Sequence, residues 1–469
     1  MKKLSILALA AILVIFFTVP AAALENEFGG YWRTRFFSQK YFTGFDRGDV
    51  TNDAGDRADD DTVERTDTRT RLYYTAKIND NLKFVNKFEY DAIWGDSSSS
   101  SRNYGKVGAD GVDIQVKNSY ADFNLGSVNF TVGVQPYSLF RDFQISDDAS
   151  GIIARWKAMD NFVLAGSWLK SFEGGEGDGE NEDVDTYTVT GAFWFNENIS
   201  LKPSISTTYT DELPEAIAGA ILGLASPASI SGDTPFIVND EGPHGDAYLV
   251  TYGADFDMTF DKWGLWVTAF GQVGEVNDVK VDRNEDGAAD AERDFDIEAY
   301  LVAVGGNIDF GGDLGLGLHG EFFYASGDDD ADDKNIEGVV SPFGSYYWSE
   351  IMGYGIFDNR ASANSPADKI TNIWAANIGV DMKPMDKLKV ALDLWYAERV
   401  EDEQVPNNED TLGTELDLLV TYQLVEGLNL DLVGAYLWAD NATANSEPPG
   451  AKSNKEDPYE FGARLSLSF

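Results

Sequence analysis

One segment of the sequence has the spacing of oxygen ligands that a calcium ion requires. Asp282, Asn284 and Asp286 occupy alternate positions, a glycine follows, and Asp290 closes the run. Carboxylate and amide oxygens spaced in this way wrap a hard cation, and the glycine permits the sharp turn. The twelfth position is Arg293, where an EF-hand has a bidentate Glu. The pattern predicts an EF-like Ca²⁺ loop over 282–294. The alternative is a polar turn whose spacing arises by chance in a very acidic protein.

Residues suited to catalysis are scarce. The chain has no cysteine and two histidines, His244 and His319. Without cysteine there is no thiol nucleophile, thiolate metal site or disulfide. Neither histidine has a nucleophile motif beside it, and a lone histidine is by default a hydrogen-bonded structural one. We therefore expect no catalytic residue, no enzymatic activity and no required cofactor.

The composition narrows the class of protein. The 469 residues include 80 Asp and Glu against 35 Lys and Arg, giving a formal net charge of −45. This balance argues against a nucleic-acid binder, because phosphate contacts require clustered Lys and Arg. Hydrophobic residues make up 43% and aromatic residues 13% of the chain. That content is too high for a disordered acidic chain.

The first 23 residues have the pattern of a secretory signal peptide. Lys2 and Lys3 form a basic start, residues 4–19 are apolar, and the small residues 21–23 suit cleavage. An amino-terminal membrane anchor is the alternative, but the apolar run is short and ends at Pro20. We expect residues 1–23 to be removed and residues 24–469 to form one domain.

The remaining chain alternates with the period of two that is typical of β-strands. In 411–424, Leu416, Leu418 and Tyr422 fall on one face, whereas Glu415 and Asp417 fall on the other. Eighteen such segments are predicted, near 28–38, 67–78, 82–94, 111–125, 127–136, 151–159, 161–171, 184–195, 199–210, 247–260, 264–275, 294–309, 314–326, 370–382, 387–399, 411–424, 427–439 and 457–469.

The connections between these segments alternate between short and long. Short turns such as 79–81, 196–198 and 425–426 are followed by long gaps such as 211–246 and 327–369. Tight turns on one side and long loops on the other are typical of an outer-membrane barrel. We therefore predict an all-β fold: a transmembrane antiparallel β-barrel of about 18 strands with short periplasmic turns and long extracellular loops. Eighteen strands leave an aqueous lumen, whereas about eight would be filled by side chains.

The last segment and the last third of the chain carry a family resemblance. Tyr459, Phe461, Leu465, Leu467 and Phe469 alternate with polar residues, and the final residue is aromatic. This resembles the terminal strand of Gram-negative outer-membrane proteins, which implies that Phe469 is a signal read by the barrel-assembly machinery.

A second likeness concerns the acidic loop after 322–328, which leads to the aromatic run 342–347. It resembles the eighteen-stranded alginate-export-like and substrate-specific porins. The resemblance extends over the barrel as a whole, but the motif that carries it is short. Members of that family that export polyanions have a strongly basic lumen, and this acidic chain departs from that pattern.

The face predicted to line the lumen carries charges of both signs. Arginines in early strands and carboxylates in later strands would create a transverse field, and rings of charge set ion selectivity in channels. The alternative is a set of solvated ion pairs, each of little energetic value. The predicted pore-lining residues are Arg33, Arg35, Arg69, Arg71, Lys83, Lys87, Arg155, Asp296, Glu298, Lys389, Glu415 and Asp417.

Two long loops could narrow such a pore. Residues 211–246 and 327–369 are too long for bare connections, which indicates a function or a partial fold. Aromatics in the second loop suit sugar stacking or an interfacial girdle. Inward-pointing Trp266, Phe270, Phe323 and Trp395 would form an aromatic track in a sugar channel.

The function predicted is that of a porin for passive diffusion of small hydrophilic solutes or ions. A dedicated oligosaccharide or polysaccharide channel and a barrel sheath around a periplasmic or extracellular partner are the alternatives. We expect the protein in the Gram-negative outer membrane, in contact with lipid and lipopolysaccharide. A homotrimer is implied by resemblance alone.

Overall fold

The described part of the chain covers nearly all of the predicted strands. The computed structural model describes residues 25–42, 62–96, 104–107, 113–174, 182–214, 236–237, 245–282, 291–329, 334–341, 343, 346–355, 357, 365–401, 409–444 and 456–469. The predicted signal peptide 1–23, most of loop 211–246 and the calcium-loop residues 284, 286 and 290 lie outside this part.

Eighteen strands form the wall of a barrel, as the sequence predicts. They are β1 (Glu25–Lys40), β2 (Val63–Asn79), β3 (Leu82–Trp94), β5 (Gln115–Leu125), β6 (Val128–Leu139), β7 (Ile145–Met159), β8 (Phe162–Phe172), β9 (Val184–Asn196), β10 (Ile199–Thr210), β12 (Ala247–Phe260), β13 (Trp263–Asp282), β14 (Ala291–Gly311), β15 (Leu316–Ala325), β17 (Ile373–Met385), β18 (Leu388–Glu398), β19 (Thr411–Val425), β20 (Leu428–Ala439) and β21 (Tyr459–Ser468). The described chain also contains three two-residue strands, β4 (Tyr104–Gly105), β11 (Phe236–Ile237) and β16 (Asn335–Ile336), and a short helix, α3 (Asn441–Ala444).

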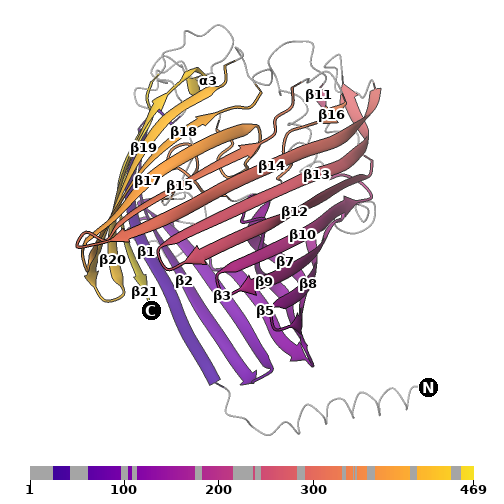
Figure 1. Cartoon of the computed structure of the whole chain (residues 1–469), viewed down its shortest axis with the longest axis horizontal. Helices are drawn as coiled ribbons and strands as arrows, with labels where there is room; N and C mark the ends of the chain where they lie inside the picture. Colours follow the sequence, from indigo (N-terminus) through magenta and orange to yellow (C-terminus); the bar gives the residue numbers. More distant parts are fainter. Residues whose placement is uncertain are drawn as a thin grey trace.

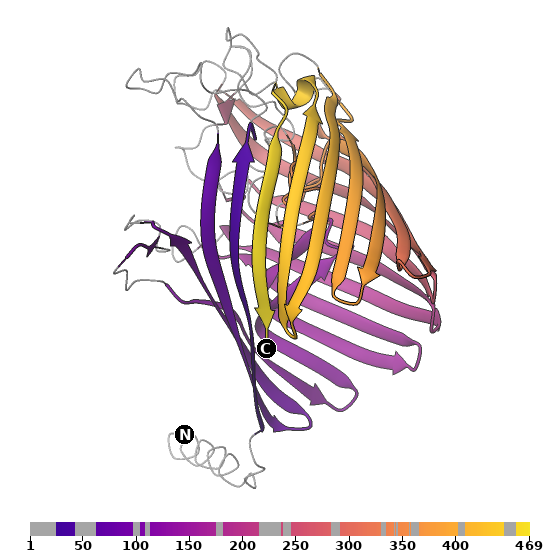
Figure 2. The same cartoon turned by 90° about the vertical axis from the view of Figure 1, so that its left-hand side faces the viewer.

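The sheet closes because its first and last strands pair. β1 is antiparallel to β2 on one side and to β21 on the other, and every wall strand is antiparallel to both neighbours. Closure leaves no open sheet edge, so the backbone amides of the wall bond internally. The strands are strongly tilted around the barrel (Figures 1 and 2). Tight hairpin turns lie at the end where the carboxyl terminus lies, and the long connections lie at the other end (Figure 1).

The outer face of the barrel is apolar. In β14, Tyr300 and Val302 are 51% and 42% exposed, whereas the alternate residues Leu301 and Ala303 are fully buried. The same alternation exposes Leu392 and Leu394 in β18. An outward apolar band is typical of a barrel surrounded by lipid, because a bilayer offers apolar side chains no water. Among the described residues, no helix has the length and apolarity needed to cross a membrane.

The main hydrophobic core lies inside the barrel. Phe140 and Phe143, between β6 and β7, are 1% and 0% exposed, and Ile351 in the β15–β17 connection is 0% exposed. Phe140 contacts Phe270 of β13 with ring centroids 5.0 Å apart, and Phe143 contacts Phe323 of β15 at 5.8 Å. The β6–β7 connection can contact β13 and β15, which are not its neighbours in the wall, only if it lies inside the barrel. Two inward segments therefore occupy part of the lumen.

Candidate functional site

The first inward segment is the tip of the β6–β7 hairpin, residues 139–145. Phe140, Arg141 and Asp142 have φ angles of 51°, 51° and 70°. Non-glycine residues in this left-handed region carry strain, which the surrounding contacts must offset. Arg141 supplies such contacts: its guanidinium pairs with Asp257, donates to Thr268 Oγ1 at 3.3 Å and lies 4.6 Å from the centre of the Trp266 ring.

The second inward segment, described at residues 334–341, 343, 346–355 and 357, is held by side chains of the wall. Gln272 donates from Nε2 to Val340 O at 2.8 Å and accepts from Val340 N at 2.9 Å, which copies the pairing of two peptide groups. Further along, Glu415 of β19 accepts from the amides of Ile351 and Met352 at 2.6 and 2.9 Å. Carboxylates that accept backbone N–H groups form strong charge-assisted hydrogen bonds. The segment is thus fixed to two strands of the wall, β13 and β19.

The two inward segments meet through aromatic rings. Phe143 and Tyr346 stack with centroids 3.8 Å apart. The Tyr346 hydroxyl donates to the carboxylate of Glu321, with both oxygens 3.0 Å away. Burial, together with the neighbouring Glu321 carboxylate, raises the pKa of the Tyr346 hydroxyl above its usual value. The hydroxyl therefore remains a donor at neutral pH, and the contact is maintained.

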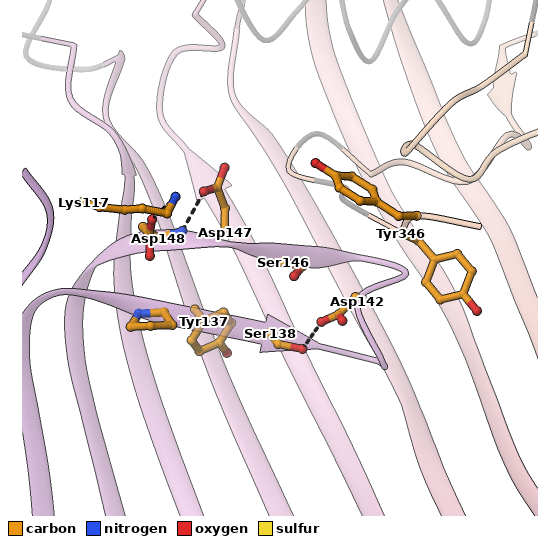
Figure 3. Close-up of a pocket in the computed structure, with 10 residues that line it drawn as sticks. Lys117, Tyr137, Ser138, Asp142, Ser146, Asp147, Asp148 and Tyr346 are labelled. Carbon is orange, nitrogen blue, oxygen red and sulfur yellow. Dashed lines mark hydrogen bonds and ion pairs between the residues drawn. The ribbon is translucent and has the colours of Figure 1, made fainter. Parts of the chain in front are cut away.

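A polar cavity of about 660 Å³ borders this junction. Figure 3 shows the β6–β7 hairpin extending toward Tyr346, with Asp142 and Asp147 on the cavity side. Lys117 contributes a positive charge and pairs with Asp148 at 2.7 Å. The cavity is lined by Lys117, Pro136, Tyr137, Ser138, Asp142, Ser146, Asp147, Asp148, Tyr346 and Tyr347.

A second cavity, of about 350 Å³, shares Tyr347 with the first. Its wall side comes from β15, β17, β18 and β19, and its loop side comes from Tyr347, Trp348, Glu350 and Gly355. We call the eight wall positions at this level the acidic wall: His319, Glu321, Asn377, Gly379, Asp393, Trp395, Glu415 and Asp417.

The strand register explains how the acidic wall forms. His319 pairs with Gly379, Gly379 with Asp393, and Asp393 with Asp417 across four successive strands. One pleat higher, the same strands bring Glu321, Asn377, Trp395 and Glu415 into line. Opposite residues of an antiparallel pair point to the same face. The predicted pore-lining residues Glu415 and Asp417 therefore lie on the inner face beside two carboxylates that are remote in sequence.

His319 is bound between two carboxylates of this region. Its Nδ1 lies 2.6 Å from Asp381 Oδ2 and its Nε2 lies 2.6 Å from Asp393 Oδ1. Only the doubly protonated ring can donate to both acceptors. This agrees with the sequence-based interpretation of His319 as a hydrogen-bonded structural histidine.

The predicted arginines lie together on three adjacent strands, β1, β2 and β21. We call this cluster the basic wall: Arg33, Arg35, Arg69, Arg71 and Arg464. Arg33 lies opposite Arg69, and Arg35 lies opposite Arg464. Their charge is offset locally. Arg35 Nε lies 2.9 Å from Asp67, Arg69 forms two 2.8 Å bonds to Asp91, Arg71 pairs with Glu89, and Arg464 Nη2 lies 2.8 Å from Asp431.

Four further predicted lumen residues have separate positions on the inner face. Lys83 pairs with Asp122 at 3.1 Å near a tight turn, and the Lys87 ammonium lies 5.3 Å from the centre of the Tyr73 ring. Arg155 donates to Thr131 Oγ1 at 2.7 Å. Lys389 lies opposite Thr421 on the face that carries Asp393 and Trp395. None of these four joins the cavities described above.

The structure corrects the prediction for Asp296 and Glu298. Both are exposed and share the outer face of β14 with Tyr300, whereas Ile297 is 3% exposed on the inner face. Ile297 packs there with Ile336 and other apolar side chains of the inward segment. The inner face is apolar at this level because the inward segment covers it. Reading the carboxylates as lumen residues therefore inverted the two faces.

The predicted calcium loop is described at one ligand only. Asp282 ends β13, and the other three predicted ligands lie outside the described residues. Within the part of the chain that the structure does describe, no group of three or more His, Asp or Glu residues has a geometry suited to a metal ion.

Phe469 lies beside the start of β1. Its carbonyl accepts from Gly30 N at 2.9 Å, and its amide donates to Gly30 O at 3.2 Å. The Phe469 ring covers Gly30, where a Cβ atom would overlap it. The terminal residue thus extends the pairing of β21 with β1 that closes the barrel.

The inward hairpin tip at 139–145 was not predicted from the sequence. A signal was available, since Leu139, Phe140 and Phe143 place three large apolar side chains in a predicted loop. Such side chains require burial. The long predicted loop 327–369 does enter the lumen through its described part, as expected of a constricting loop. Trp266, Phe270 and Trp395 do point inward, but Phe270 and Trp395 are only 4% and 5% exposed and pack against the inward segments.

A closed antiparallel barrel of eighteen wall strands with inward-folded connections has the architecture of porins. Solved structures agree. The chain is similar to OpdK of Pseudomonas aeruginosa, solved with vanillate (TM-score 0.53, 10% identity, 95% of this chain and 98% of that chain). It is also similar to OccAB2 of Acinetobacter baumannii (TM-score 0.54, 10% identity, 95% and 98%) and to a BenF-like porin from Pseudomonas fluorescens Pf-5 (TM-score 0.52, 12% identity, 95% and 99%).

These identities are low, so the likeness concerns the fold. No protein-family model matches the chain, and no curated protein matches its sequence. The expected resemblance to outer-membrane porins is confirmed for the architecture. What passes through the barrel must be argued from its own side chains.

Proposed function

We propose that the protein is an outer-membrane channel for passive diffusion of small hydrophilic solutes or ions. The observation that carries this proposal is the pair of cavities, lined by charged and aromatic side chains, between inward segments and wall, inside a barrel with an apolar outer face. Solutes would pass through the cavity beside the contact between the hairpin tip and Tyr346, and then along the acidic wall. A lumen narrowed by inward segments and lined by charged side chains selects solutes by size and charge.

The structural neighbours support the same reading. One of them is described as a porin, and OpdK was solved with vanillate, a small aromatic molecule. The two alternative functions fit less well. A sheath around a protein partner requires an unobstructed lumen, whereas two segments cross this one. A polysaccharide channel requires an open aromatic track, whereas Phe270 and Trp395 are packed.

Planar-bilayer recording tests the proposal. The purified protein should give stepwise conductance in KCl, and a salt gradient should show cation preference because the basic wall is offset by its own carboxylates. A folded barrel without conductance would overturn the channel proposal. Anion preference would retain the channel but place the basic wall at the narrowest point.

Export and assembly are part of the same proposal. Residues 1–23 would direct secretion, and Phe469 would be read by the assembly machinery of the outer membrane. Mass spectrometry of the mature protein should show a start near residue 24. Replacing Phe469 with Ala should lower the amount of folded barrel in the outer membrane, whereas normal assembly would exclude the signal. Cross-linking in native membranes would test the homotrimer.

We also propose, from sequence spacing, that residues 282–294 bind Ca²⁺. Isothermal titration of the purified barrel with CaCl₂ should show a site that Asp286→Asn weakens. Equal heats for the two proteins would overturn it.

A further inference from the structure

We propose that the acidic wall, together with Tyr347, Trp348 and Glu350, forms a binding subsite for a small organic cation: an amine without a carboxylate. This inference rests on the channel function proposed above, and it names the class of solute. The subsite is the cavity of about 350 Å³ beneath the inward segment, which is sized for a small molecule rather than a polymer.

The register places like charges directly opposite one another. Asp393 of β18 and Asp417 of β19 are partners on the inner face. Like charges at opposite positions of an antiparallel pair are destabilising. His319 and Asn377 stabilise Asp393, since both donate to its Oδ1 at 2.6 and 3.1 Å. Asp417 receives neither of these donors.

The carboxyl group of Asp417 lacks a positively charged neighbour within the cavity lining. It is 8% exposed, lines the cavity, and lies beside the buried carboxyl of Glu415. Its Oδ2 accepts from Glu350 N at 3.3 Å, whereas no basic, amide or hydroxyl donor of the described residues reaches its Oδ1. The side chain in contact with it is another carboxyl group, that of Glu415. Two adjacent buried carboxyl groups are costly when charged, and an ammonium group in the cavity would offset their charge.

The charge of the cavity favours a cation over a neutral or anionic solute. Its lining contains four carboxylates, from Glu321, Glu350, Asp393 and Asp417, against one imidazolium. Asp393 pairs with His319, and the charge of Arg141 acts on Glu321. An anionic carboxylate on the solute would be repelled by this arrangement.

The aromatic lining suits the apolar part of an amine. Tyr347, Trp348 and Trp395 border the cavity, and Tyr347 is 47% exposed. Aromatic rings attract cations through their faces and cover alkyl chains. On the basic wall, by contrast, Arg35, Arg69, Arg71 and Arg464 are already paired with carboxylates.

Putrescine is a suitable probe, with maltose and succinate as neutral and anionic comparisons. Added to single channels in KCl, putrescine should reduce the current in a saturable manner, and succinate should not. Asp417→Asn removes the charge but keeps an oxygen for Glu350 N, so the segment stays in place. It should weaken the apparent putrescine affinity about tenfold or more, the value of one charge-assisted hydrogen bond.

Asp122→Asn is the matched control, because Asp122 is an inner-face carboxylate outside the cavity and pairs with Lys83. It should leave the putrescine affinity unchanged. Equal responses of Asp417→Asn and Asp122→Asn would overturn the proposal. A maltose block that Asp417→Asn abolishes would also overturn it and indicate a saccharide subsite.

Titration calorimetry of the detergent-solubilised barrel with putrescine separates this inference from the channel function. Binding that depends on Asp417 in a protein without conductance would retain the subsite and remove the channel. Conductance without putrescine binding would do the reverse.

Discussion

Gly379 controls whether the acidic wall can form. It lies between His319 and Asp393 in the register, and a Cβ atom there would overlap His319 Nε2 and Asp393 Oδ1. The hydrogen bond between these two side chains therefore passes over β17 only because residue 379 has no side chain. A bond between strands that are not neighbours couples β15 to β18.

Gly379→Ala should break that bond and lower the free energy of unfolding by about 1–3 kcal/mol, as for overpacking of a closed space. Urea titration of the refolded protein, followed by tryptophan fluorescence, measures the change. Gly434→Ala is the control, because nothing lies within 4 Å of a Cβ atom at that strand position. Equal effects of the two substitutions would contradict the steric explanation.

The hairpin tip at 139–145 is an element whose position depends on contacts with the wall, among them those of Arg141. Three consecutive left-handed residues cost about 1–3 kcal/mol each, so the tip needs external contacts. Arg141 reaches across the lumen to Asp257, which also receives Lys202 at 3.3 Å. While the contact between Arg141 and Asp257 is present, the hairpin tip stays in the lumen and narrows it.

Arg141→Ala should release the tip and raise the single-channel conductance. Lys157→Ala is the comparison, since Lys157 pairs with Asp160 at an exposed turn, 3.0 Å away, and should leave conductance unchanged. An unchanged conductance in Arg141→Ala would show that the other contacts of the tip, such as those with Phe270 and Thr251, hold it in place.

The whole barrel depends on the seam between β1 and β21. Arg35 and Arg464 lie opposite each other across this seam. Each is neutralised on its far side, Arg35 by Asp67 and Arg464 by Asp431. These pairs are largely buried, so removing one carboxylate leaves two arginines facing each other in a medium of low dielectric constant.

Asp431→Asn should therefore lower the free energy of unfolding by about 3 kcal/mol. Asp122→Asn removes a carboxylate from a more exposed pair and should cost less than about 1 kcal/mol. Guanidinium unfolding of both proteins in the same detergent measures the difference. If the two losses are equal, the seam is closed by backbone pairing and its charges are incidental.

Alternation with period two was enough to predict the number of wall strands, the turn and loop ends, and the face of most residues. The arginines of β1 and β2 and the carboxylates of β19 lie on the predicted inner face. This worked because the pleat of a strand is local, and successive side chains must point to opposite faces.

The contacts between remote segments were decided by the folded barrel. His319 and Asp393 are 74 residues apart, and Arg141 and Asp257 are 116 residues apart. Register between strands and the entry of loops into the lumen depend on long-range packing, which no local pattern specifies. Asp296 and Glu298 show the consequence. The inward segment makes the inner face of β14 apolar, so polarity alone assigned these two residues to the wrong side.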